Sequence, residues 1–312
     1  MLLPLMRMNY LFLTALLFLV VVFLGCNSAN SRSVSIAKAQ LGPSPTPDQE
    51  NPKQLEDIFV DDGRLSYSGY DVLRLKKKIK YEYPDERGKT KSNLIEVSYA
   101  VVKRNNRRLA KFEGVYFIEG NATDFGLFSL LGGNSKQLIV SQTVPRGGRH
   151  WVASFSPDFH VLFDSGDYGV GREEFNVIDI DKDGVYELSL PVTAFYMMQD
   201  KMYIAEIPLP EVIFKYDPKA KKYFPAMALF EDYALRGIEN DIKTLNQSGE
   251  SNYLSKRLGI FLRYIYAEKE NEAWAFFDRE YEFPDKEEMK SRIQAILKDE
   301  GVYKYIHRKR AT

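Results

Sequence analysis

The sequence predicts an α+β protein in which an antiparallel β-meander, packed as a sandwich or as part of a propeller, precedes a small C-terminal helical domain. Two patterns along the 312 residues predict this. From residue 57 to 225, short runs alternate apolar and polar residues and are separated by turns, which is typical of half-buried strands. From residue 226 to 312, apolar residues recur three or four positions apart, as on one face of a helix. No helical pattern separates the strands, so an antiparallel arrangement is expected.

Residues 1–56 are expected to form an export signal and a linker. Arg7 precedes an apolar run from Leu11 to Cys26, which is typical of a signal peptide, here residues 1–25. An uncleaved signal anchor is the alternative, although the run is short of the ~20 apolar residues that a membrane span needs. Residues 26–56 are rich in Ser, Asn, Pro and Gln, which predicts a disordered linker. Its reach as a flexible coil is ~30 Å.

The end of the apolar run carries the only cysteine of the chain. Phe23-Leu24-Gly25-Cys26 resembles a bacterial lipobox. The resemblance implies cleavage before Cys26 and acylation of its thiol and amine, with palmitate as one such acyl group. The protein would then be a lipoprotein anchored by lipid in the cell envelope, on the periplasmic or extracellular face. A single cysteine also excludes an intramolecular disulfide.

The β region is read as a series of strands and hairpins. Leu73 to Tyr83 alternates apolar and charged residues, and the polar stretch PDERGKTKSN leads to a second strand around Ile95 to Val101. Asn105-Asn106 predicts a tight hairpin into the next strand. The further predicted strands are QLIVSQT, HWVASFS, HVLFDSG, EFNVIDI, YELSLPVTAFYMM and EVIFKYDPKAKKYF, the last folding over at Asp217-Pro218.

The stretch DIDKDGVYEL places oxygen ligands around a tight turn, as calcium prefers. Acids stand at positions 1, 3, 5 and 9, glycine at position 6, and a backbone carbonyl at position 7 would complete the set. The predicted ligands are Asp179, Asp181, Asp183, Val185 and Glu187. An EF-hand would need a glutamate at position 12, where Leu190 stands. The loop instead resembles the calcium loop of integrin-type β-propeller (FG-GAP) repeats, of which one copy is found. A solvated hairpin tip is the alternative.

A second group of acids lies just upstream, at Asp164, Asp167, Glu173 and Glu174. It could form a second ion site, a carboxylate pair for glycoside hydrolysis, or a solvated loop. His150 and His160 could in principle join Asp158 and a nearby serine in a catalytic triad, although the G-x-S-x-G motif is absent.

Three apolar stripes predict helices in the C-terminal region. They are Ile238, Ile242 and Leu245; Leu258, Phe261, Leu262 and Ile265; and Met289, Ile293, Ile296 and Leu297. Asp285 and Glu288 follow Pro284 and predict a capping box. Tyr264, Ala273 and Phe277 resemble signature positions of a tetratricopeptide repeat. Because only one unit aligns, a single helical hairpin packed on the β domain is expected. Trp274, Phe276 and Phe277 would then be core residues, with a partner groove as the alternative.

No catalytic motif in the sequence rises above background, so a binding protein is expected rather than an enzyme. The chain has 43 basic and 43 acidic residues, so nucleic acid is not expected as a partner. Alternation places Arg74, Lys76, Lys78 and Lys80 on one strand face, which indicates either a protected sheet edge or a surface for an anionic polymer. We therefore expect a non-catalytic, membrane-anchored protein that binds an envelope protein or an anionic polymer. The alternative is a cell-envelope hydrolase that uses the acids of residues 164–187.

Overall fold

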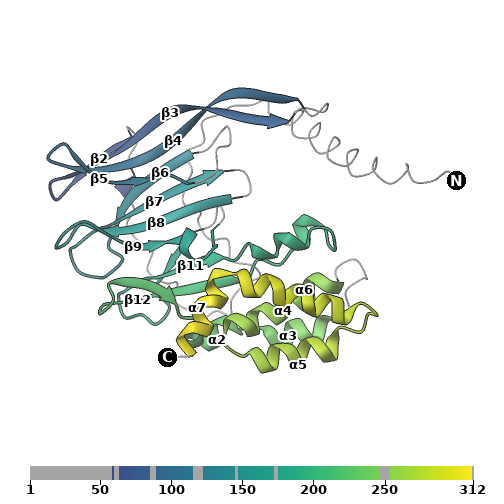
Figure 1. The fold of residues 1–312 in the computed structure, drawn as a ribbon. Helices are drawn as coiled ribbons and strands as arrows, with labels where there is room; N and C mark the ends of the chain where they lie inside the picture. Colours follow the sequence, from purple (N-terminus) through teal and green to yellow (C-terminus); the bar gives the residue numbers. More distant parts are fainter. Residues whose placement is uncertain are drawn as a thin grey trace. The chain divides into compact units, whose positions relative to one another are not determined.

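A computed structural model describes residues 58–59, 63–84, 89–114, 122–144, 147–171, 175–245 and 253–310. The signal, Cys26 and the linker lie outside these residues. The described chain forms three antiparallel sheets followed by helices (Figure 1), which confirms the predicted α+β class. No helix in these ranges is long and apolar enough to cross a membrane.

The first sheet along the chain is a four-stranded meander in the order β2-β3-β4-β5. Its strands are β2 (Arg64–Tyr67), β3 (Tyr70–Pro84), β4 (Thr90–Arg104) and β5 (Arg107–Phe112). The predicted hairpin at Asn105-Asn106 is confirmed, because both residues have the positive φ of a two-residue turn, 50° and 59°. β3 and β4 form a long curved hairpin along the top of the view in Figure 1.

The second sheet is five-stranded, in the order β1-β6-β7-β8-β9. Its strands are β1 (Ile58–Phe59), β6 (Ala122–Phe128), β7 (Gln137–Val144), β8 (Gly147–Ser154) and β9 (His160–Asp164). Both faces are buried: Leu138 and Val140 share a core with Val72 of β3, whereas Ile139 and Val152 belong to a separate core with the third sheet and the helices. β7 is therefore apolar at successive positions, as expected for a strand covered on both sides.

The third sheet has the order β10-β11-β12-β13. Its strands are β10 (Asn176–Ile178), β11 (Glu187–Pro191), β12 (Glu211–Asp217) and β13 (Lys222–Pro225). One face meets the second sheet, where the rings of Phe163 and Phe214 lie 4.9 Å apart. Ile213 and Lys215 lie on the opposite face, where Phe230 covers Lys215 at 5.4 Å. Facing sheets of this kind form a layered sandwich.

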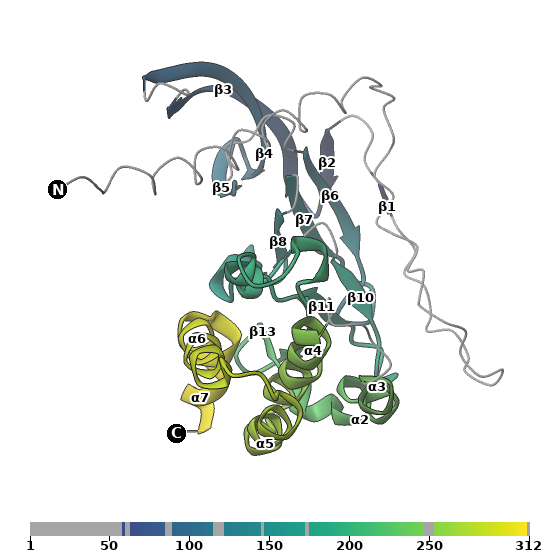
Figure 2. The same ribbon diagram turned by 90° about the vertical axis from the view of Figure 1, so that its right-hand side faces the viewer.

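The helical region consists of α2 (Glu231–Ala234), α3 (Ile238–Thr244), α4 (Tyr253–Tyr266), α5 (Glu270–Glu280), α6 (Lys286–Asp299) and α7 (Gly301–Arg310) (Figure 2). The predicted stripes face the core, which is continuous with the third sheet. α4 and α5 pack as the expected hairpin: the ring of Phe261 lies 4.6 Å from that of Trp274 and 5.7 Å from that of Phe277.

The predicted capping box at the start of α6 is wrong, although the helix does begin directly after Asp285. The side chain of Asp285 caps no backbone N–H and instead accepts a hydrogen bond from the hydroxyl of Tyr281 at 3.0 Å. Glu288 pairs with Lys201 at 3.1 Å, in the connection between β11 and β12. Asp285 is thus engaged by a residue four positions earlier and Glu288 by a distant one, so neither acid caps the helix end.

Candidate cation-binding loop

The acidic loop from Asp179 to Tyr186 joins β10 to β11 and is closed by its own carboxylates. Gly184 has a φ of +83°, which a glycine adopts without strain, so the chain can reverse here. The N–H of Gly184 donates to Asp179 Oδ2 at 3.2 Å, and that of Val185 donates to Asp183 Oδ1 at 2.7 Å. The N–H of Ile180 donates to Glu187 Oε2 at 2.9 Å, which fixes the buried end of the loop.

Three carboxylates converge inside this loop. One oxygen from each of Asp179, Asp181 and Glu187 lies within 4.8 Å of the other two. The side chain of Glu187 is fully buried, and the buried Oδ1 of Asp179 accepts no hydrogen bond from any residue that the structure describes. An arrangement of convergent carboxylate oxygens with an unsatisfied buried acceptor suits a hard cation such as calcium or magnesium. The described residues thus contain an acidic group that could hold a metal ion.

The two remaining predicted ligands lie at the edge of this group. Asp183 is not part of the convergent set; its Oδ1 accepts the N–H of Val185 at 2.7 Å and its Oδ2 lies 3.2 Å from Lys215 Nζ. Val185 contributes that N–H, and the role of its carbonyl as a ligand of the ion remains a prediction.

Lys215 enters the group from the neighbouring strand and was missed by the sequence reasoning. Its Nζ lies 2.7 Å from Asp181 Oδ2, 3.2 Å from Asp183 Oδ2 and 3.0 Å from Glu187 Oε1. The pairing of Leu188 with Phe214 places Glu187 directly across from Lys215 in the next pair. The only signal in the sequence is that this lysine interrupts the apolar part of EVIFKYD. The protein therefore supplies one positive charge to its own acidic loop.

The pKa values of Lys215, Asp183 and Glu187 are shifted by burial and by their hydrogen bonds. Burial disfavours the ammonium of Lys215, but its hydrogen bonds to three carboxylates outweigh burial and raise its pKa above the ordinary value. Burial would raise the pKa of Asp183, yet the N–H of Val185 and the ammonium lower it overall. Burial raises the pKa of Glu187 despite its bonds to Ile180 and Lys215. With a single lysine among four carboxylates, the group keeps a net negative charge that a further cation would reduce.

The upstream acids do not form a comparable cluster in the described residues. Asp164 is held by Arg149 through two hydrogen bonds, of 2.9 and 2.7 Å, and also accepts the N–H of Gly166 at 2.9 Å. Asp167 is exposed, and Glu173 and Glu174 lie outside the described residues. Asp164 is thus engaged in a part-buried ion pair rather than open for acid-base chemistry.

His150 occupies a structural position. His150 is buried, its Nδ1 lies 3.0 Å from Ser141 Oγ, and its ring stacks on Phe175 at 5.0 Å. Ser154 is four residues further along β8, roughly 13 Å away in an extended strand, and so is out of reach. The triad considered from the sequence is therefore not assembled from His150 and Ser154.

Comparison of the chain with protein-family models, curated proteins and solved structures gives no match. The resemblances to a lipobox, to an FG-GAP loop and to a tetratricopeptide repeat therefore rest on the residues named above.

Proposed function

We propose that this chain is a membrane-anchored lipoprotein of the cell envelope that acts as a non-catalytic binding protein, with a β domain stabilised by calcium. The observation that carries the proposal is that one oxygen from each of Asp179, Asp181 and Glu187 lies within 4.8 Å of the other two, while the buried Oδ1 of Asp179 accepts no hydrogen bond from the described residues. The anchor is the acylated Cys26 that the lipobox resemblance implies.

Calcium fits the donor set better than magnesium. Asp179, Asp181 and Glu187 would hold the ion through carboxylate oxygens, with Asp183 and the Val185 carbonyl as further donors. Calcium accepts several carboxylates in variable geometry, whereas magnesium keeps most of its water and demands a strict octahedron. The ion would neutralise the charge that Lys215 leaves uncompensated and so stabilise the turn between β10 and β11.

Binding is favoured over hydrolysis by the contacts of the acids themselves. Asp164 is neutralised by Arg149, and Glu187 is buried against Lys215. A glycosidase needs one carboxyl group free to donate a proton and another free to attack or to activate water. The two acids are committed to ion pairs, which supports a structural use for residues 164–187 and disfavours the alternative hydrolase.

The calcium role is tested with the full chain purified in non-ionic detergent. Extracellular calcium modules have dissociation constants of about 0.1 to 1 mM, so several millimolar calcium should add about 1 kcal/mol of stability. The melting temperature should then rise by about 3 °C over its value in chelator. Asp181→Asn with Asp183→Asn should abolish the rise.

A matched control exchanges two exposed acids, Glu287→Gln with Asp299→Asn, and should keep the calcium response. Identical melting temperatures of the unmodified protein in chelator and in calcium would exclude the calcium role and leave Lys215 as the cation of the loop.

A further inference from the structure

A basic surface lies at the C-terminal end of the described chain, distant in sequence from the acidic loop. From residue 298 to 309, Lys and Arg are found at Lys298, Lys304, Arg308 and Lys309. The acids in this stretch are Asp299 and Glu300, and Glu300 is buried. Because the whole chain has a net charge of zero, this concentration of one sign marks a distinct electrostatic feature.

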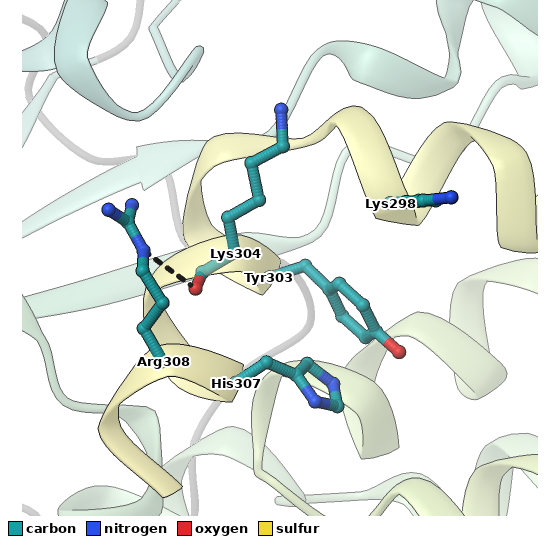
Figure 3. Close-up of a pocket in the computed structure, with 5 residues that line it drawn as sticks. All are labelled: Lys298, Tyr303, Lys304, His307 and Arg308. Carbon is teal, nitrogen blue, oxygen red and sulfur yellow. Dashed lines mark hydrogen bonds between the residues drawn. The ribbon is translucent and has the colours of Figure 1, made fainter. Parts of the chain in front are cut away.

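An open pocket of about 490 Å³ lies on this surface, lined by Lys298, Tyr303, Lys304, His307 and Arg308 (Figure 3). Lys304 and Arg308 stand one helical turn apart on α7, and so do Tyr303 and His307. In Figure 3 the aromatic pair lies side by side, and the side chains of Lys304 and Arg308 leave the helix on a neighbouring side. The pocket therefore combines two rings with a basic rim.

The two rings are held in place by one carboxylate of α5. Their centroids are 4.0 Å apart. The hydroxyl of Tyr303 donates to Glu270 Oε1 at 2.8 Å, and His307 Nε2 lies 3.3 Å from Glu270 Oε2. Glu270 thus fixes the positions of the two rings. The cationic residues of the pocket are those of its rim, Lys298, Lys304 and Arg308.

The cations of the rim are weakly compensated. Lys298 and Arg308 form no ion pair with a carboxylate of the described residues, and Lys304 lies 3.8 Å from Asp299, whose side chain is 92% exposed. The basic face of β3 differs, because Lys76 pairs with Glu96 at 2.8 Å and Lys80 pairs with Glu82 at 2.6 Å. Of the two basic surfaces, the pocket has the greater capacity to attract an anion.

We propose that this pocket binds phosphate groups of a phosphodiester polymer of the envelope, an inference that rests on the proposed binding function. An arginine fork and two lysines can donate charge-assisted hydrogen bonds to phosphate oxygens, and the rings can contact the carbon backbone of the polymer. A bilayer surface fits less well, because membrane-surface helices bury large apolar side chains. The exposed large apolar side chains of the described residues lie elsewhere, at Leu94, Leu109, Met197, Tyr203, Leu229 and Phe283.

The test compares two charge reversals of equal size in the full chain, purified in non-ionic detergent, with poly(glycerol phosphate) as the probe. Lys298→Glu with Arg308→Glu acts on the pocket, whereas Lys76→Glu with Lys78→Glu acts on β3 and changes the net charge by the same amount. The pocket variant should bind about tenfold more weakly at low ionic strength, and the β3 variant less than about threefold more weakly. Binding should also fall as salt screens the charges.

Absence of binding by the unmodified protein at low salt, or equal weakening in both variants, overturns the proposal. Binding to phosphatidylglycerol vesicles without binding to the polymer also overturns it and assigns the surface to lipid. Circular dichroism melting checks that each variant is folded, and Lys298→Gln with Arg308→Gln replaces the reversal if it is not. Calcium-dependent melting and acylation of Cys26 are measured on the same preparations, so a failed pocket is distinguished from a failed lipoprotein assignment.

Discussion

Nζ of Lys215 lies 3.0 Å from Oε1 of Glu187, whose side chain is fully buried. The two residues face each other on β11 and β12, and the same ammonium reaches Asp181 and Asp183. Acids crowded in one short loop repel each other unless a positive charge lies among them. Lys215 supplies part of that charge from within the fold, so the loop can form without an ion and still has an excess of negative charge to attract one.

The first prediction concerns removal of this internal cation. Lys215→Met keeps a long unbranched side chain over Phe230 but leaves Glu187 buried without its partner. We expect a loss of about 2 kcal/mol in unfolding free energy in the presence of chelator, with the cost limited by protonation of the carboxyl. Calcium should bind the variant more tightly and recover much of the loss. Both effects are measured by urea unfolding with and without calcium.

Lys222→Met, at the exposed start of β13, is the control and should change stability little. If Lys215→Met is as stable as the control in chelator, the contacts of Lys215 with the acids contribute no net stability.

The acidic loop illustrates what the spacing of residues in a sequence can and cannot predict. Asp179, Asp181 and Glu187 could be grouped in advance, because a glycine turn between acids brings nearby residues together. Lys215 could not, because its position depends on the register between β11 and β12, which are separated by a connection of two short 3-10 turns. A local pattern contains no information about which residue a neighbouring strand will place opposite.

The same distinction holds for the fold. Alternation predicted β3 and β4, and the helical stripes predicted α4 and α6, because each pattern reports one buried face. These local patterns did not predict how the three sheets pack on one another, since contacts such as that of Phe163 with Phe214 join segments far apart in the sequence. The predicted capping box is wrong because Tyr281, four residues before Asp285, and Lys201, in the connection between β11 and β12, engage the two acids that the rule assigns to the helix end.

The second prediction concerns Gly301, the first residue of α7, which lies against the backbone of Tyr168. A Cβ on Gly301 would lie 2.6 Å from the Cα, carbonyl carbon and oxygen of Tyr168. Gly301→Ala should therefore destabilise the protein by about 2 to 3 kcal/mol, because backbone cannot move aside as a flexible side chain can. Chemical denaturation measures the effect.

Gly259→Ala on α4 is the matched control, since its Cβ would meet only Pro208 at an ordinary 3.5 Å. It should be neutral or stabilising by up to about 1 kcal/mol, as expected when alanine replaces glycine within a helix. Equal stability of the two variants would mean that α7 can shift away from Tyr168 at little cost.

The third prediction concerns pH. Glu300 caps α7 by accepting the N–H groups of Val302 and Tyr303 at 2.8 and 2.7 Å, and burial raises its pKa from 4.5 to about 7. Because the folded-state pKa is the higher one, the folded protein binds more protons at intermediate pH. The contribution of the Glu300 carboxyl to the unfolding free energy is therefore complete below about pH 4.5, and it is lost as the pH rises through about 7.

Glu300→Gln removes this titration. The stability of this variant relative to the unmodified protein should improve by about 2.5 kcal/mol from about pH 5 to pH 8. Any cost of losing the acceptor does not depend on pH and does not affect this change. Glu287→Gln, whose side chain is 84% exposed, should give no such change of slope. Parallel stability curves for Glu300→Gln and the unmodified protein would show that the carboxyl titrates alike in the folded and unfolded states.

The last prediction concerns the anchor. If Cys26 is the acyl acceptor, Cys26→Ala should abolish labelling by an alkyne fatty acid and should block cleavage of the signal, whereas Ser28→Ala should retain labelling and cleavage. A single acyl chain binds a bilayer only marginally, while two or more hold a protein firmly. The unmodified protein should consequently resist extraction by concentrated salt and yield only to detergent. Unchanged labelling of Cys26→Ala would exclude lipid attachment at this residue. An unmodified protein that carries no label, keeps its signal and stays in the membrane fraction would favour an uncleaved apolar anchor at Leu11 to Cys26.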